Sequence, residues 1–467
     1  MEEKKSKSKN LVKGMLIYAI GNFGSKVLLF LIVPVYTYYI STEDMGKYDL
    51  MMTTINLLTP IVTMQISDAA YRWMIREEEG KEVYICSSVQ VLVINCFIAS
   101  LIITLINLIF PFRYSGYFIL TLITSRVLAT IQKLLRGLKN QKLFALSGIT
   151  YTIIFLAFNI IQICYLAKGI ESLFLSAIIA NLAAVVLIFA LEKELRIPYL
   201  KKMDLGIVKT LLKFSVPLVP NQLNWWIINS SDRYVISFFL NASANGIYSI
   251  SYKFPTMLQV ILSFFTTSWQ DVAVSDTTKD SGQFYTGVFK HLYMLSFGLL
   301  WVLNPATKMF IQLFMNANYH SAAEYISFLY LGTVFQSFAS FYGVGYLRDR
   351  KTNQAASSSI YGAVVNALIN IVLIKFIGLQ AASISTFLGF LVMWLIRERQ
   401  NRRELGVVID IKLFLQLFLI TILLSIIECF TDIYIDSILL VLGGIMFLSV
   451  NRNAMNAVRV KFFQRYR

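Results

Sequence analysis

Apolar runs long enough to cross a lipid bilayer recur from Gly14 to the C-terminal tail, and they constrain the fold more than any other feature. The hydrocarbon core of a bilayer is about 30 Å thick and requires roughly 20 apolar residues of helix. Charged residues make up only 15% of the chain, against about a quarter in soluble domains. The runs are also longer than the alternating segments of roughly 10 residues that form barrel strands. The sequence therefore predicts an all-α polytopic membrane protein.

The hydropathy pattern predicts about 14 transmembrane helices. The turn at Gly378 is so short that the two helices beside it are expected to form a hairpin. The predicted spans are 14–39, 46–69, 84–110, 117–137, 143–166, 170–191, 211–240, 245–270, 286–314, 323–346, 355–377, 379–397, 411–430 and 434–450.

Lysine and arginine fall in alternate gaps between the spans, which predicts the orientation of the chain. The basic segments are 4–13, 72–81, 133–142, 193–209, 348–351, 397–403 and 452–467. This pattern places both termini in the cytoplasm. The gap at 271–285 is acidic, and its cytoplasmic location is inferred only from the spans on either side. The net charge of +16 is thus explained by topology, and nucleic acid is not an expected partner.

The chain shows no catalytic or cofactor-binding motif. It has two histidines without metal spacing, no phosphate-binding loop and no dinucleotide fingerprint. The four cysteines lie in or near spans and are interpreted as small hydrophobic residues, while Gly443 and Gly444 are interpreted as helix-packing positions. We expect no cofactor, no metal and no enzymatic activity.

Two halves of the chain share a weak repeat. Gly46-Lys47-Tyr48 opens a span that contains Pro60, and Gly246-Ile247-Tyr248 opens one that contains Pro255. Internal repeats that flank a site at the membrane midplane are a common transporter plan. The predicted organisation is an N-lobe at 1–191, a cytoplasmic linker at 192–210, a C-lobe at 211–397, and two further spans with a basic tail at 398–467.

Ionisable residues inside the predicted spans are the first candidates for a binding site, because each costs at least 2–3 kcal/mol on insertion scales. Lys26, Arg126 and Lys253 lie within spans, and Asp232-Arg233 lies towards the outer end of the seventh. Cations outnumber anions, so a cavity lined by them would suit an anionic passenger. Arg233 and Lys308 could instead extend to the interface, and Asp232 could neutralise Arg233 or Lys253. No carboxylate stands out as a proton or sodium site.

Amide and indole side chains extend this candidate set. They are what a sugar-lined pathway would offer through hydrogen bonds and stacking, and they are also what helix packing uses. The predicted polar contacts are Asn22, Gln65, Asn221, Asn224 and Trp225.

Several short segments resemble the O-antigen (Wzx-type) flippases, a family of polysaccharide biosynthesis proteins. The resemblance covers most of the chain and depends on the order of its motifs. These are the segments 16–26, 34–36, 46–50, 213–221, 231–234 and 246–249, followed by Asn366, Asn370 and 378–382.

The resemblance implies the fold of the multidrug/oligosaccharidyl-lipid/polysaccharide exporter superfamily. Two pseudo-repeated six-helix lobes would surround a central cavity, with two extra C-terminal helices. It further implies alternating access and transfer of an undecaprenyl-diphosphate-linked sugar across the bacterial cytoplasmic membrane. Expected partners are that lipid-linked glycan and the bilayer, with a polysaccharide polymerase and a chain-length regulator as candidates. Related lipid II flippases carry cations in spans one, two and eight; Lys26 and Lys253 match two of them, while the second span lacks a central cation.

Three alternatives remain open from the sequence. A lipid II or teichoic-type flippase is the nearest. A drug/cation antiporter of the same fold would need acidic residues where this chain has basic ones. A membrane glycan polymerase would need a long outer loop, and the outer turns here are short.

Overall fold

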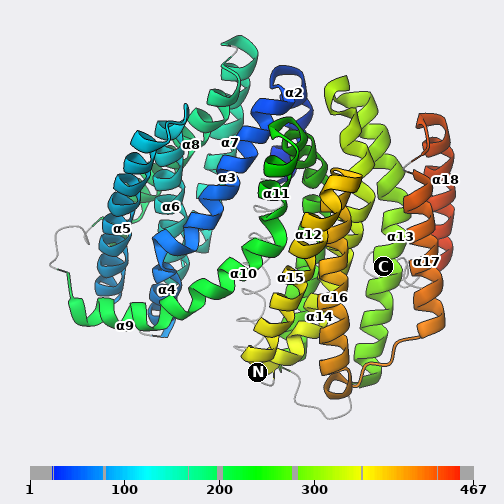
Figure 1. Ribbon diagram of the computed structural model, residues 1–467. Helices are drawn as coiled ribbons and strands as arrows, with labels where there is room; N and C mark the ends of the chain where they lie inside the picture. The colour runs from blue at the N-terminus through cyan, green and yellow to red at the C-terminus, as the bar shows by residue number, and fades with distance from the viewer. Residues whose placement is uncertain are drawn as a thin grey trace, which may run out of the picture. The chain divides into compact units, whose positions relative to one another are not determined.

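The computed structural model describes residues 24, 26–76, 80–166, 168–196, 203–275, 282–348, 351–428 and 430–452 (Figure 1). The regular structure across these residues is helical, which confirms the predicted all-α fold. Packing divides the chain into an N-terminal unit, Met1–Trp226, and a C-terminal unit, Ile227–Arg467. The lobe and linker boundaries expected from the sequence stay a prediction.

The N-terminal unit contains the strongly apolar helices that precede the predicted linker. Its elements are α2 (Val33–Tyr39), α3 (Thr42–Thr63), α4 (Ile66–Arg76), α5 (Lys81–Ile109), α6 (Ser115–Gly137), α7 (Gln141–Ile160), the π-turn η1 (Ile161–Tyr165), α8 (Ile170–Leu191), the 3-10 turn η2 (Lys193–Leu195), α9 (Leu205–Ser215), the 3-10 turn η4 (Val216–Leu218) and the start of α10 (Val219–Ser230).

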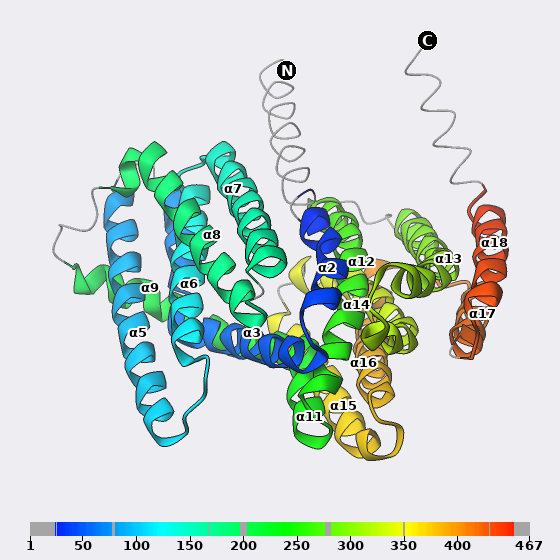
Figure 2. The same cartoon turned by 90° about the horizontal axis from the view of Figure 1, so that it is seen from above.

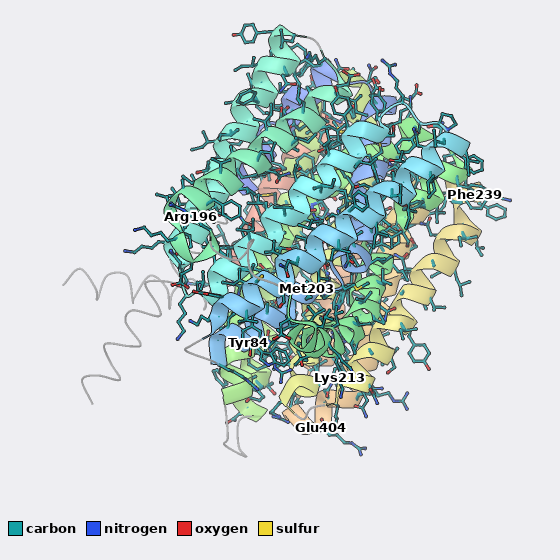
Figure 3. All side chains as sticks on the ribbon, turned by 90° about the vertical axis from the view of Figure 1, so that its left-hand side faces the viewer. Tyr84, Arg196, Met203, Lys213, Phe239 and Glu404 are labelled. Carbon is teal, nitrogen blue, oxygen red and sulfur yellow. The ribbon has the colours of Figure 1, made fainter. Side chains whose placement is uncertain are left out.

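Helices α6, α7 and α8 pack side by side in this unit (Figures 1 and 2). Its main core joins α4, α5, α6, α8 and α9 and includes the fully buried Met74, Leu134 and Leu211. Tyr84 of α5 and Met203, both labelled in Figure 3, pack against that core. Short α9 lies across the end of α5, with an apolar side facing the core and lysines elsewhere (Figure 1). Such an arrangement is typical of helices that lie at a membrane interface.

The C-terminal unit contains longer helices. After the end of α10 come α11 (Asp232–Phe239), α12 (Ala242–Ser275), α13 (Gly282–Phe314), the 3-10 segment η5 (Ala317–Tyr325), α14 (Ile326–Arg348), α15 (Thr352–Ile377), α16 (Gln380–Leu405), α17 (Ile411–Glu428) and α18 (Ile433–Val450).

Glycines allow close helix contacts in the C-terminal unit. Helices α15 and α16 form the predicted hairpin around Gly378, whose φ of +57° belongs to the left-handed region that glycine adopts readily. Gly443 of α18 faces α13, where an added methyl group would collide with the Trp301 carbonyl. Gly444 faces open space. Gly443 is therefore a packing position, as expected, because its lack of a side chain permits close approach of two helices.

A buried polar cluster also attaches α17 and α18 to α13 (Figure 1). Lys308 Nζ lies 3.3 Å from Asp436 Oδ2 and donates to the Glu428 carbonyl at 2.7 Å. The Asp436 side chain is fully buried, and that of Lys308 is 9% exposed. One expectation was that Lys308 extends to the interface. It does not, because Asp436 provides a partner within the bundle.

The described residues of each predicted span are mostly helical, with short breaks such as the one between Thr63 and Ile66. Nine described helices are long and apolar enough to cross a membrane, or ten when α3 and α4 count as one bent span. The long helices α12 and α14 are more polar and are not among the nine. The seventh predicted span is divided into the end of α9, η4, α10 and α11, with breaks near Pro217 and Ser231.

The Gly443 contact yields a stability prediction. Gly443→Ala should lower the thermal unfolding midpoint of the detergent-solubilised protein, since overpacking typically costs about 1–3 kcal/mol. Gly444→Ala is the matched control and should unfold like the unmodified chain. Equal midpoints for the two variants would show that α13 and α18 do not approach as closely as described.

Candidate functional site

A break between α3 and α4 shapes the polar region of the N-terminal unit. Met64 and Gln65 have φ values of 45° and 51°, and the two helices are bent by 55°. For residues with side chains this conformation costs about 1–2 kcal/mol each. Asn95 Nδ2 donates to the Val62 carbonyl at 2.9 Å, so a neighbouring helix satisfies part of the interrupted backbone.

Pro60 adds a second irregularity one turn before the break. Proline has no N–H, so it cannot donate the usual helical hydrogen bond to the Asn56 carbonyl. Nearby, Trp226 Nε1 of α10 donates to the Thr53 carbonyl of α3 at 3.0 Å and joins the two helices. Polar groups on α3 and α10 consequently face a common space.

That space is a cavity of about 260 Å³, here called the amide cavity. It contains two of the predicted polar residues, Gln65 and Trp225, together with the predicted cation Arg126. The full lining is Asn56, Thr59, Pro60, Gln65, Arg126, Gln222, Trp225 and Trp226.

Arg126 of α6 is half-buried and is oriented by neutral groups. Its Nη1 donates to Thr59 Oγ1 at 2.6 Å, and its Nε donates to Ser125 Oγ at 3.3 Å. Asp68 of α4, a helix that packs against α6, forms an ion pair with Lys133. Within the described ranges, Arg126 makes no ion pair with any carboxylate.

A second cavity, of about 360 Å³, also contains Arg126 and is here called the cation cavity. Lys26 shares it, and no described carboxylate pairs with Lys26 either. Apart from the two cations, the polar residues of this cavity come from α6, α7 and α8. The full lining is Lys26, Leu29, Ser125, Arg126, Leu128, Ala129, Gln132, Phe144, Ala145, Gly148, Tyr151, Thr152 and Asn181. Two cations in one cavity can bind an anion with two or more negative charges.

The C-terminal unit contains Asp232, a predicted site residue that the sequence did not mark as a proton or cation site. Asp232 is fully buried and accepts hydrogen bonds from Tyr248 Oη at 2.9 Å, Thr386 Oγ1 at 2.7 Å and Asn370 Nδ2 at 3.1 Å. All three of these partners are neutral side chains. A carboxylate held in this way can bind a proton or a cation. No cluster of three metal-ligating acids, histidines or cysteines occurs among the residues described.

The other predicted contacts that the structure describes line neither cavity. Arg233 is buried, donates to the Asn229 carbonyl at 2.8 Å and lies 4.5 Å from the Tyr252 ring, whereas Lys253 is exposed on α12. Asn221 is exposed and Asn224 half-buried on α10, and neither lines either cavity. Asn22 lies outside the described residues.

Several residues that line the two cavities were not predicted from the sequence. Asn56 and Thr59 on α3, and Gln132 and Asn181 facing the cation cavity, were not predicted. One signal was available in the sequence: Asn56 lies four residues before Pro60 within an apolar span. In a helix, the carbonyl at that position lacks its usual N–H donor, because proline has none.

Comparison with known proteins identifies the family at this point. The family model described as polysaccharide biosynthesis protein matches residues 11–269, which is more than half of the chain. The chain belongs to the polysaccharide biosynthesis protein family. A search of curated protein sequences gives no match.

Solved structures support the fold of this family member. The lipid II flippase MurJ in an inward closed conformation is similar with a TM-score of 0.70 at 14% identity, over 95% of this chain and 99% of that one. An inward-facing multidrug resistance MATE family transporter of the MOP superfamily is similar with a TM-score of 0.63 at 13% identity, over 82% and 94% of the chains. A Vibrio cholerae MATE transporter VcmN mutant is similar with a TM-score of 0.57 at 13% identity, over 86% of this chain and 99% of that one. These similarities confirm the predicted polytopic transporter fold.

The Asp232 environment predicts a stability effect. Asp232→Leu would leave three buried donors without their acceptor, at about 1–3 kcal/mol for each unsatisfied group. We expect a clear fall in the thermal unfolding midpoint in detergent, with a smaller fall for Asp232→Asn. Glu43→Ala removes an exposed acid that pairs with Lys47 and should change the midpoint little. A midpoint for Asp232→Leu as high as that of the Glu43 control would contradict the described network.

Proposed function

We propose that this polysaccharide biosynthesis protein is a flippase for an undecaprenyl-diphosphate-linked oligosaccharide, such as an O-antigen, capsular or exopolysaccharide repeat unit. The observation that carries the proposal is the cation cavity, which Lys26 and Arg126 share without a carboxylate partner among the described residues. The diphosphate would bind there. The family match and the transporter fold support this assignment.

The physical task of such a protein explains the cavity. A diphosphate group crossing hydrocarbon without help would lose its hydration, which is prohibitively unfavourable. A cationic cavity that opens alternately to each side of the membrane replaces water with fixed positive charge. The sugar would travel in the same cavity system while the polyprenyl chain remains in the lipid.

The proposal includes the location and orientation of the chain. We place it in the bacterial cytoplasmic membrane with both termini in the cytoplasm, from the positions of lysine and arginine. A polysaccharide polymerase and a chain-length regulator are proposed partners, because they would use the lipid-linked product on the outer face.

Other functions of this fold are less consistent with the site. A lipid II or teichoic-type flippase is the second candidate, because lipid II carries the same diphosphate and the MurJ structure is similar. A multidrug or cation antiporter is disfavoured, because both charged residues of the cation cavity are basic. A membrane glycan polymerase is disfavoured by the family match and by similarity to transporters.

Removing the Lys26 charge should abolish transport. In the native host, Lys26→Ala and Lys26→Glu should eliminate surface polysaccharide and accumulate lipid-linked glycan on the cytoplasmic side, while the protein remains in the membrane. Identifying that glycan separates an oligosaccharide repeat unit from lipid II. Lys142→Ala removes an exposed charge at the start of α7 and should leave display intact. Full surface display by Lys26→Ala would refute the assignment.

A further inference from the structure

The amide cavity lies against the cation cavity, and Arg126 is a wall of both. We propose that the amide cavity binds the sugar ring attached directly to the diphosphate and selects that sugar. This inference rests on the proposed function, since it requires a diphosphate at Lys26 and Arg126. It adds a specificity site formed by Asn56, Gln65, Gln222 and Trp225.

The shared guanidinium determines where the sugar would lie. A diphosphate bound between Lys26 and Arg126 contacts one side of the guanidinium. The group attached to that diphosphate is then next to the other cavity that Arg126 lines. Thr59 holds the guanidinium through a 2.6 Å hydrogen bond, so the wall between the two cavities has a defined position.

The lining chemistry suits a carbohydrate. Each amide of Asn56, Gln65 and Gln222 offers a carbonyl acceptor and two N–H donors, which complement sugar hydroxyls that both donate and accept. Indole rings offer flat apolar faces for the C–H groups of a pyranose. Three amides, a hydroxyl and a guanidinium line one small space beside two indole rings and a proline.

Helix packing is the alternative role for amides within the predicted spans, and the hydrogen bonds argue against it. Packing amides hydrogen-bond across helices, as Asn95 does to the Val62 carbonyl. Across the described ranges, the side-chain amides of Asn56, Gln65 and Gln222 make no hydrogen bond to another residue. Their donors and acceptors are therefore available to a ligand.

The volume limits the size of the ligand. The amide cavity measures about 260 Å³, below the roughly 300–1,000 Å³ of pockets for drug-sized molecules. This volume accommodates one sugar ring, and because the cavity is open, further sugars can extend beyond it. Selection would thus act on the first sugar, and the remaining sugars would lie outside this cavity.

Site-specific thiol protection tests the inference in the full-length protein after replacement of its native cysteines. Gln222→Cys reports on the amide cavity, and Gly148→Cys reports on the cation cavity, where a Cβ at Gly148 meets open space. The probes are undecaprenyl diphosphate and undecaprenyl diphosphate carrying a single N-acetylglucosamine, each added before a small charged thiol reagent.

We expect both lipids to slow labelling of Gly148→Cys, and only the sugar-bearing lipid to slow labelling of Gln222→Cys by about fivefold or more. Equal protection of Gln222→Cys by the two lipids, or protection by neither while Gly148→Cys is protected, would overturn the sugar site and leave the proposed function intact. If neither lipid protects Gly148→Cys, both the sugar site and the proposed function would be overturned.

Selectivity provides a second readout. Lipids carrying glucose or galactose as the single sugar differ in one hydroxyl configuration, so a hydrogen-bonding site should distinguish them. Gln222→Leu should reduce the ratio of their affinities by about fivefold while binding of undecaprenyl diphosphate stays unchanged. Gln141→Leu, an exposed position at the start of α7, is the matched control. An unchanged ratio in Gln222→Leu would contradict a role of Gln222 in sugar selection.

Discussion

The positive charge of Arg126, held among apolar helices by two neutral hydroxyls, is the constraint that explains most of the N-terminal unit. A cation in hydrocarbon requires a carboxylate, water or an anionic ligand. No described carboxylate supplies that partner, and the cavities on both sides of the guanidinium leave room for the other two. The polar linings of these cavities follow from the same requirement, because they solvate the charge and any group that it binds.

Comparison of three cations inside the helix bundles separates structural roles from binding roles. Lys308 pairs with Asp436 and attaches the C-terminal helices to α13. Arg397 is 5% exposed and uses three nitrogens for hydrogen bonds to Ser358, Ser359 and the Ala339 carbonyl, so its donors join neighbouring helices. Arg126 makes two hydrogen bonds and lines two cavities. Charge alone therefore does not identify a binding residue; the partner and the adjacent space do.

The sequence predicted the fold because each span must bury about 20 apolar residues, and this requirement is visible without tertiary information. It also identified Lys26, Arg126, Gln65 and Trp225, which line the cavities. The break at Met64–Gln65 could not be predicted, since neither residue is glycine or proline. The Lys308–Asp436 pair joins residues far apart in the chain, and the neutral donors around Asp232 come from three helices. Such contacts depend on packing that a linear pattern does not specify.

The central claim is that Arg126 binds the diphosphate of the transported lipid, and binding of undecaprenyl diphosphate to the purified protein tests it directly. Titration of the unmodified chain, Arg126→Lys and Arg126→Gln would give three dissociation constants. Hydrogen bonds to charged groups contribute about 1.5–3 kcal/mol, so Arg126→Gln should weaken binding at least tenfold, and Arg126→Lys should retain part of the affinity. Equal affinity in all three proteins would contradict the account, because the charge would then have no anionic ligand.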